Sequence, residues 1–138
     1  MLRRWLLLCV VAFTVIAAAA APRTAPTDTA SVAAGAKIFA KYCETCHGKT
    51  GKGDGPTGKA LNPHPRNFTK ASEFKSKNDE DAFKVISKGG ASMGLSPLMV
   101  AWGSVLKEPQ IWQVLGYVRT FAKAATPAPA PAAAPANK

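Results

Sequence analysis

Apolar residues recur at steps of three and four positions in three stretches of this chain, a spacing that places them on one face of an α-helix. The first stretch covers residues 32–42, the second covers residues 79–88, and the third begins near Pro109. The segments between these stretches are rich in Gly, Pro and Asn and contain no convincing strand pattern. The pattern therefore predicts an all-α domain in which at least three helices are joined by long loops.

The beginning of the chain has a different composition. A short positive stretch (residues 1–4), an apolar run (residues 5–16) and a set of small residues (residues 17–21) follow one another in the order of a secretory signal peptide. We therefore expect residues 1–21 to be a cleaved signal peptide, which would place the protein in the periplasm. The alternative is an uncleaved membrane anchor, because the apolar run approaches the length that spans a bilayer.

Composition also divides the rest of the chain. Residues 22–32 are rich in Pro, Thr and Ala and are predicted to form a linker, whereas residues 124–138 repeat Pro and Ala and are predicted to form a disordered tail. The helical patterns lie in residues 33–123, which we expect to form the single folded domain. A domain of this size buries little apolar surface and often needs a metal or cofactor for stability.

Lysine and arginine number 18 against 8 aspartates and glutamates, which gives a formal net charge of +10. Such an excess steers a protein toward acidic partners or anionic surfaces. The lysines are scattered along the chain, and no nucleic-acid-binding motif accompanies them, so we expect no nucleic acid partner. The charge therefore favours protein partners with acidic docking patches, and it also helps to keep a small exported protein soluble.

The segment Cys43-Glu44-Thr45-Cys46-His47 has the pattern C-x-x-C-H, which is the haem attachment motif. Two thiols at this spacing can add to the two vinyl groups of a porphyrin, and the adjacent histidine then supplies one axial nitrogen to the iron. A disulfide redox site would be expected near a strand–helix unit, which the sequence does not predict here. A structural zinc site requires four suitably spaced ligands, and the adjacent Cys46 and His47 are poorly placed to share one ion.

Around this motif, over residues 33–123, the sequence resembles the class I cytochromes c, a family that includes small bacterial monohaem c-type cytochromes. The motif follows a predicted helix that contains Gly35 and Phe39, the stretch 94–103 is similar to the family's methionine loop, and the last helix carries aromatic residues such as Tyr117. The resemblance implies the cytochrome c fold, with helices and long loops wrapped around one covalently bound haem c. It also implies that the first and last helices cross near the haem.

A low-spin electron-transfer haem needs a second axial ligand, and a methionine sulfur raises the reduction potential relative to a nitrogen donor. The resemblance assigns this role to Met99 in the methionine loop, although Val100 stands where proline commonly follows the ligand. Two alternatives remain open. Met93 lies in a flexible stretch beside a glycine, and His64 lies between two prolines soon after the motif.

Other residues are expected around the haem. A ligating histidine usually donates its second ring N–H to a nearby acceptor, and the resemblance implies a proline carbonyl in this role for His47, with Pro63 and Pro65 as candidates. Arg66, or Trp102 through its indole N–H, is expected to meet a haem propionate. The side chains expected to wall the haem from water are Phe68, Leu98 and Leu106.

These features predict an electron carrier rather than an enzyme, in which the iron alternates between Fe(II) and Fe(III) and the electron passes through the exposed haem edge. Lysines near that edge are expected to dock acidic patches on the donor and the acceptor; the candidates are Lys49, Lys52, Lys59, Lys88 and Lys107. The alternative function is a haem-bearing electron-transfer subunit of a respiratory oxidase or of a periplasmic dehydrogenase, with the Pro/Ala-rich segments as tethers.

Overall fold

The computed structural model describes residues 22–70 and 78–124, and within these ranges it contains helices and no strand, which confirms the predicted all-α fold. The expected signal peptide and residues 125–138 of the expected tail lie outside the described residues. No described helix combines the length and the apolar character needed to cross a membrane. In chain order, the elements are α1 (Thr29–Tyr42), α2 (Glu44–His47), η1 (Gly58–Ala60), α3 (Asp79–Lys88), η2 (Gly90–Met93) and α4 (Glu108–Ala124).

Helix α1 begins three residues before the expected start at Val32, because Asp28 caps it. The Asp28 side chain accepts a hydrogen bond from the backbone N–H of Ser31 at 2.8 Å, which satisfies one of the free donors of the first turn. The expected linker over residues 22–32 is therefore corrected. Its last four residues are helical, and Ala25 is buried in the core with 8% of its surface exposed.

Helix α3 occupies the predicted residues, and local signals account for both of its ends. The Asn78 side chain accepts a hydrogen bond from the backbone N–H of Asp81 at 2.7 Å, and the acidic first turn complements the helix dipole. Gly89, with a φ of 83°, ends the helix in a conformation that other residues rarely adopt. Helix α4 carries Pro109 in its first turn, where the missing N–H has no helical partner to lose.

Helices α1 and α4 cross at Gly35 and form the base of the domain. A Cβ atom at Gly35 would collide with the carbonyl group of Gln113, so glycine is what allows the two backbones to approach this closely. Beside the crossing, Phe39 is 1% exposed, and its ring centroid lies 5.4 Å from those of Tyr117 and Phe121. The crossing of the first and last helices that the resemblance implied is therefore present.

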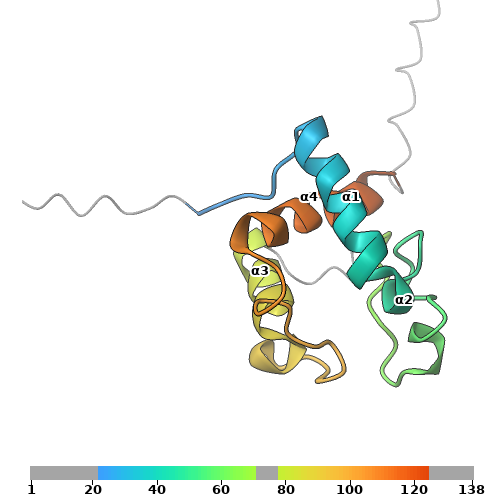
Figure 1. Ribbon diagram of the computed structural model, residues 1–138. Coiled ribbons are helices and arrows are strands. Elements are labelled where there is room, and N and C mark those ends of the chain that lie inside the picture. Colours follow the sequence, from blue (N-terminus) through green and yellow to red (C-terminus); the bar gives the residue numbers. More distant parts are fainter. Residues whose placement is uncertain (1–21, 71–77, 125–138) are drawn as a thin grey trace, which may run out of the picture.

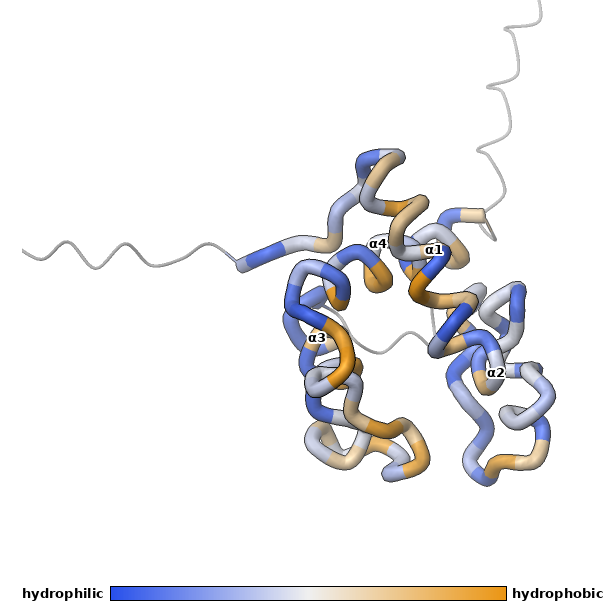
Figure 2. Tube along the Cα trace, in the orientation of Figure 1, coloured by the Kyte–Doolittle hydropathy of each residue, from blue (hydrophilic) through white to orange (hydrophobic). Residues whose placement is uncertain are grey.

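Two lobes extend from this base (Figure 1). We call residues 43–70 the histidine lobe, which contains α2 and η1. We call residues 78–107 the methionine lobe, which contains α3, η2 and the loop that leads to α4. Figure 2 shows apolar positions on α3 and along that loop. The fold thus places the C-x-x-C-H motif and the methionine loop in two separate lobes that share one base.

Candidate functional site

A cavity of about 520 Å³ is lined by residues of both lobes and of the base. Its volume is typical of small-molecule and cofactor sites. Five core side chains are buried and also line this cavity, namely Phe39, Ala82, Val114, Leu115 and Val118. The cavity therefore reaches into the core of the domain, where an apolar occupant would pack against these side chains.

The C-x-x-C-H residues reach the cavity from the junction of α1 and α2. Helix α1 ends at Tyr42, and Cys43 caps it. The chain continues in the single turn of α2, where the N–H of His47 donates to the Cys43 carbonyl at 2.9 Å. This turn brings the side chains of Cys43, Cys46 and His47 to the cavity lining together. The two cysteines are not joined to each other in a disulfide. The structure thus gathers the three residues that the motif singled out.

Burial keeps Cys43 and His47 uncharged at neutral pH. It raises the pKa of the Cys43 thiol to about 12, an effect to which the neighbouring Cys46 adds. It lowers the pKa of His47 to about 4, against the smaller opposing influence of the Arg66 backbone. His47 is therefore neutral at pH 7, and a neutral imidazole has a nitrogen lone pair available for a metal ion.

The ring of His47 stacks on Phe68, with centroids 4.6 Å apart and planes inclined by 18°. Its Nδ1 atom is buried and has no hydrogen-bond partner among the described residues. The Pro65 carbonyl, one of the two expected acceptors, lies against Gly53, where a Cβ atom would collide with it. The backbone group that raises the pKa of the imidazole is that of Arg66, one residue after Pro65.

The three candidates for the second axial ligand differ in position. Met99 lines the cavity from the methionine lobe. Its backbone carbonyl accepts a hydrogen bond of 2.8 Å from the N–H of Gly90 at the start of η2. Met93 is 38% exposed and is not part of the lining. His64 lines the cavity from the histidine lobe, where its Nδ1 lies 3.3 Å from a backbone carbonyl of η1. Of the three, Met99 alone lines the cavity from the lobe opposite His47.

The other expected pocket residues line the cavity, with one exception. Trp102 also packs against Tyr42, with ring centroids 5.3 Å apart, and so joins the methionine lobe to the end of α1. Leu106 is 4% exposed but is not part of the lining, which corrects the expectation that it walls the pocket. Its N–H bonds to the Trp102 carbonyl at 2.8 Å, in a turn that carries the side chain away from the cavity. The expected residues in the lining are Pro63, Pro65, Arg66, Phe68, Leu98 and Trp102.

Several lining residues were not singled out as pocket residues by the sequence, namely Tyr42, Leu61, Val85, Ile86 and Val100. Val85 and Ile86 belong to the apolar positions of the predicted second helix, so periodicity marked them as buried. Periodicity does not distinguish a residue that packs on another helix from one that faces a cavity, because both are apolar and shielded from water.

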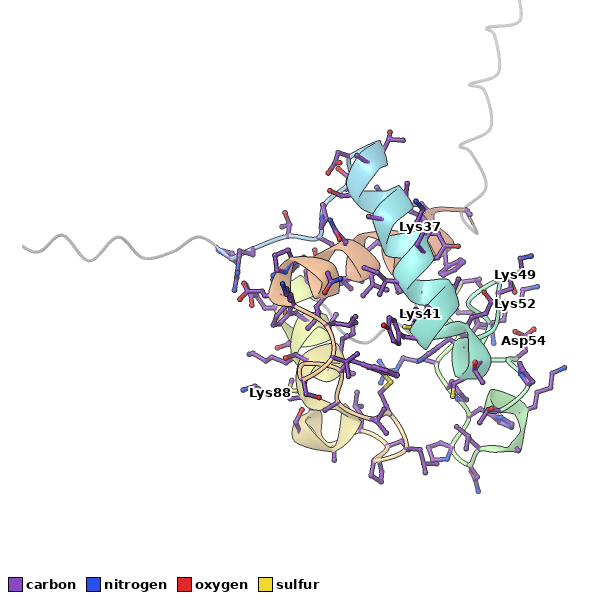
Figure 3. All side chains as sticks on the ribbon, viewed as in Figure 1. Lys37, Lys41, Lys49, Lys52, Asp54 and Lys88 are labelled. Carbon is purple, nitrogen blue, oxygen red and sulfur yellow. The ribbon has the colours of Figure 1, made fainter. Side chains whose placement is uncertain are left out.

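The lysines expected to dock partners are exposed and lie outside the cavity lining. Figure 3 shows Lys49 and Lys52 on the histidine lobe and Lys88 on the methionine lobe. Lys59 lies in η1, and Lys107 directly precedes α4. Both lobes therefore present positive charge to solvent.

Haem fits the residues of this cavity. The lining offers apolar side chains from both lobes, two thiols in one turn that are not joined to each other, and a neutral imidazole whose Nδ1 is without a partner. These are the groups needed to enclose an apolar macrocycle, to attach it covalently and to ligate its iron. Among the described residues, no three His, Cys, Asp or Glu side chains form a cluster that could hold a bare metal ion.

Comparison with known proteins also indicates haem as the group that this cavity binds. The family model described as "Cytochrome C oxidase, cbb3-type, subunit III" matches residues 30–118, which include every residue that lines the cavity. A similar curated protein is the "Cbb3-type cytochrome c oxidase subunit FixP" of Azorhizobium caulinodans, which is 32% identical over 97 residues. The aligned part is 70% of this chain but 29% of that relative, so the chain spans less than a third of the relative's length.

These matches confirm the predicted resemblance to c-type cytochromes and the role in electron transport. They also confirm the cofactor, an iron-containing haem c that is covalently attached. The family model covers well over half of the chain. The chain therefore belongs to the family of c-type cytochrome domains described as cytochrome c oxidase, cbb3-type, subunit III.

Proposed function

We propose that this chain is a haem-bearing electron-transfer domain that serves a respiratory oxidase of the cbb3 type. The observation that carries the proposal is the match to the subunit III family over residues 30–118. The relative FixP is itself described as a subunit of a cbb3-type oxidase. Both findings favour the oxidase-subunit alternative over the free electron carrier that the sequence first suggested.

In this proposal, Cys43 and Cys46 form the two thioether links, and His47 supplies the first axial nitrogen. The support is their common place in the cavity lining, the burial that keeps the imidazole neutral, and the stacking of Phe68 on its ring. A ligating histidine usually donates its other ring N–H to a neighbouring group. The Arg66 backbone, which already acts on this ring, is the candidate acceptor.

Met99 is the proposed second axial ligand. It lines the cavity from the lobe opposite His47, whereas Met93 is exposed outside the lining. His64 shares the lobe of His47, so it is less well placed to supply a donor from the opposite side. A thioether donor stabilises the reduced iron relative to a second nitrogen donor and so raises the reduction potential.

The bound haem supplies the redox chemistry, by cycling of its iron between Fe(II) and Fe(III). The residues of the chain hold it and limit the access of water. Phe68 and Leu98 line the cavity from the two lobes and would shield the haem from water, and Arg66 or Trp102 would neutralise or hydrogen-bond a propionate. Because the reaction breaks and forms no bond in a substrate, we propose no catalytic residue.

We also propose that the domain works in the periplasm and docks acidic patches on its redox partners. The support is the export-type N-terminus, the net charge of +10 and the exposed lysines on both lobes. Attraction between exposed charges is screened by salt. Electron exchange with the partner should therefore slow as ionic strength rises, and a rate that is independent of salt would contradict electrostatic docking.

Co-purification tests the assignment to an oxidase. The full-length chain carries an affinity tag and is recovered from gently solubilised membranes of cells that produce a cbb3-type oxidase. We expect the other oxidase subunits in stoichiometric amounts, with the Cys43→Ala/Cys46→Ala double variant as a control for dependence on haem. Recovery of the haem protein alone, with rapid electron exchange with several soluble redox proteins, would instead establish a free carrier.

A further inference from the structure

Residues 22–28, which we call the strap, precede α1 and lie beside the beginning of α4, as the blue segment of Figure 1 shows. Ala25 of the strap is buried in one cluster with residues of α3 and α4, namely Ala82, Trp112 and Leu115. Two members of this cluster, Ala82 and Leu115, also line the cavity. The strap therefore belongs to a cluster that reaches the cavity wall, at the junction of the methionine lobe and the base.

The strap holds the first turn of α3 through hydrogen bonds. The N–H of Ala25 donates to Oδ2 of Asp79, the first residue of α3, at 2.6 Å. The N–H of Arg23 donates to Oε1 of the next residue, Glu80, at 3.3 Å. The other carboxylate oxygen of Asp79 accepts from Arg119 of α4, at 2.7 Å from Nε and 2.5 Å from Nη2. Asp79 therefore joins the strap, α3 and α4 at one place.

The strap also fits closely onto α4. A Cβ atom at Gly116 would collide with the carbonyl of Pro26, so the helix surface has room for the strap only because this residue is glycine. The guanidinium group of Arg23 lies 5.2 Å from the ring centroid of Trp112 and forms an ion pair with Glu108 at the start of α4. Exposed ion pairs contribute little one by one. The close fit at Gly116 is therefore the most sensitive contact of the strap on this helix.

The far end of α3 carries the methionine loop. The N–H of Trp102 donates to the carbonyl of Ile86, in the last turn of α3, at 2.9 Å. Directly after the helix, the N–H of Gly90 donates to the carbonyl of Met99 at 2.8 Å. These backbone hydrogen bonds fix the loop to the end of α3. The position of α3 on α4 therefore influences where the side chain of Met99 lies in the cavity.

We propose that the strap residues are positioning residues for the second axial ligand: by fastening α3 to α4, they hold Met99 where it can ligate the iron. The proposal rests on the ligation by Met99 proposed above. Contacts behind the ligands of a metal commonly orient those ligands and tune the metal. With the strap displaced, α3 is fixed less firmly on α4, so the fraction of molecules in which the sulfur lies away from the iron should rise. A competing ligand should then bind more tightly, because its apparent affinity scales with that fraction.

Imidazole titration of the oxidised, haem-loaded, full-length protein tests the proposal without electron transfer, because imidazole competes with the Met99 sulfur for the iron. The first variant is Gly116→Ala. Apart from the backbone of α4, the atoms nearest to the added methyl group all belong to Pro26, and alanine itself favours a helix, so this change acts on the strap. We expect Gly116→Ala to bind imidazole about tenfold more tightly than the wild type.

A second variant displaces the strap from its own side. Arg23→Ala/Ala25→Gly removes the guanidinium and the buried methyl group but keeps the amide of residue 25, and we expect it to bind imidazole about threefold more tightly than the wild type. The matched control is Thr24→Ala/Thr27→Ala, because both threonines are exposed strap residues, and it should bind imidazole as the wild type does. Hydrogen exchange at the amide of residue 25 should quicken in both strap-displacing variants but not in the control.

The spectrum of the wild type separates a failure of this proposal from a failure of the ligand assignment. If the oxidised wild type lacks a red-region sulfur-to-iron charge-transfer band, the assignment of Met99 fails and this proposal fails with it. If the band is present, unchanged imidazole affinity in both strap-displacing variants overturns the positioning role alone, and so does unchanged hydrogen exchange at residue 25.

A double-variant cycle shows whether the strap acts through the sulfur. In a Met99→Ala background, Gly116→Ala should add nothing to the affinity for imidazole, because no sulfur is left for the strap to position. The same gain in affinity in that background would show that the strap controls access to the haem rather than the place of Met99, and it would overturn the proposal.

Discussion

The two lobes reach the same cavity in different ways. In the histidine lobe the backbone sets the geometry: the N–H of Gly53 donates to the carbonyl of His47 at 2.8 Å, and buried glycines let the loop fold tightly onto α2. In the methionine lobe, Leu98 and Val100 line the cavity and yet remain 49% and 54% exposed. The histidine lobe therefore holds His47 in place through its own backbone contacts. The methionine lobe instead leaves apolar side chains that the haem and a partner would cover.

The largest effect should come from the cysteines of the histidine lobe. The double variant Cys43→Ala/Cys46→Ala has no thiol left in the cavity, so we expect a complete loss of covalently attached haem. Cys9→Ala is the matched control, because Cys9 lies in the expected signal peptide and its loss should leave haem attachment unchanged. Intact-protein mass after denaturation measures both. Covalent haem in the double variant would show that the attachment lies elsewhere.

In the methionine lobe, Met99→Ala should leave the haem attached but remove one axial ligand. We expect complete loss of the red-region sulfur-to-iron charge-transfer band of the oxidised protein and a lower reduction potential, because a thioether favours the reduced iron. Met93→Ala should retain both properties, since Met93 lies outside the cavity lining. Loss of the band in Met93→Ala and not in Met99→Ala would reverse the assignment.

Two glycines with positive φ, one in each lobe, allow the tightness of backbone packing in the two lobes to be compared by substitution. Gly94, with a φ of 67°, has open space around it, so Gly94→Ala should lower the free energy of unfolding by about 1–2 kcal/mol from backbone strain alone. Gly53, with a φ of 79°, lies against the Pro65 carbonyl, so Gly53→Ala should cost a further amount of about 1–3 kcal/mol. Urea unfolding of the haem-loaded proteins measures the difference. Equal losses would mean that the histidine lobe is no more tightly packed than the methionine lobe.

The smallest effect should come from the cap of α3. Asn78→Ala removes the side chain that accepts the N–H of Asp81, and we expect a loss of about 1 kcal/mol in the free energy of unfolding. Asn78→Ser should recover most of that stability, because serine is also a good N-cap residue. Hydrogen exchange should quicken at the start of α3 and stay unchanged in α2. Faster exchange in both lobes would show that they unfold as one unit.

Local signals explain how much of the fold could be predicted from the sequence. The start of α3 was predictable because Asn78 caps it from the adjacent position and the acids of the first turn follow directly. The start of α1 was predicted too late, because Asp28 lies in a Pro- and Thr-rich stretch typical of a linker. That stretch packs through contacts with Asp79 and Gly116, which are distant in sequence and leave no local pattern.

The candidate site shows the same contrast between features with a local sequence signal and features set by tertiary contacts. The spacing of Cys43, Cys46 and His47 predicts their chemistry within five residues, so the sequence alone indicated haem. Leu106 was expected in the pocket because it is apolar and near the methionine loop, but the turn after Trp102 removes it from the lining. Whether an apolar side chain faces a cavity or the core depends on a tertiary arrangement that periodicity does not encode.

Peptide mapping of the exported, purified protein tests the central assignment most directly. Trypsin cuts after Lys41 and Lys49, so one peptide, residues 42–49, contains both cysteines and His47. We predict that this peptide carries the mass and the absorption of one haem and contains no free thiol. Recovery of the same peptide without haem and with two free thiols would contradict the account.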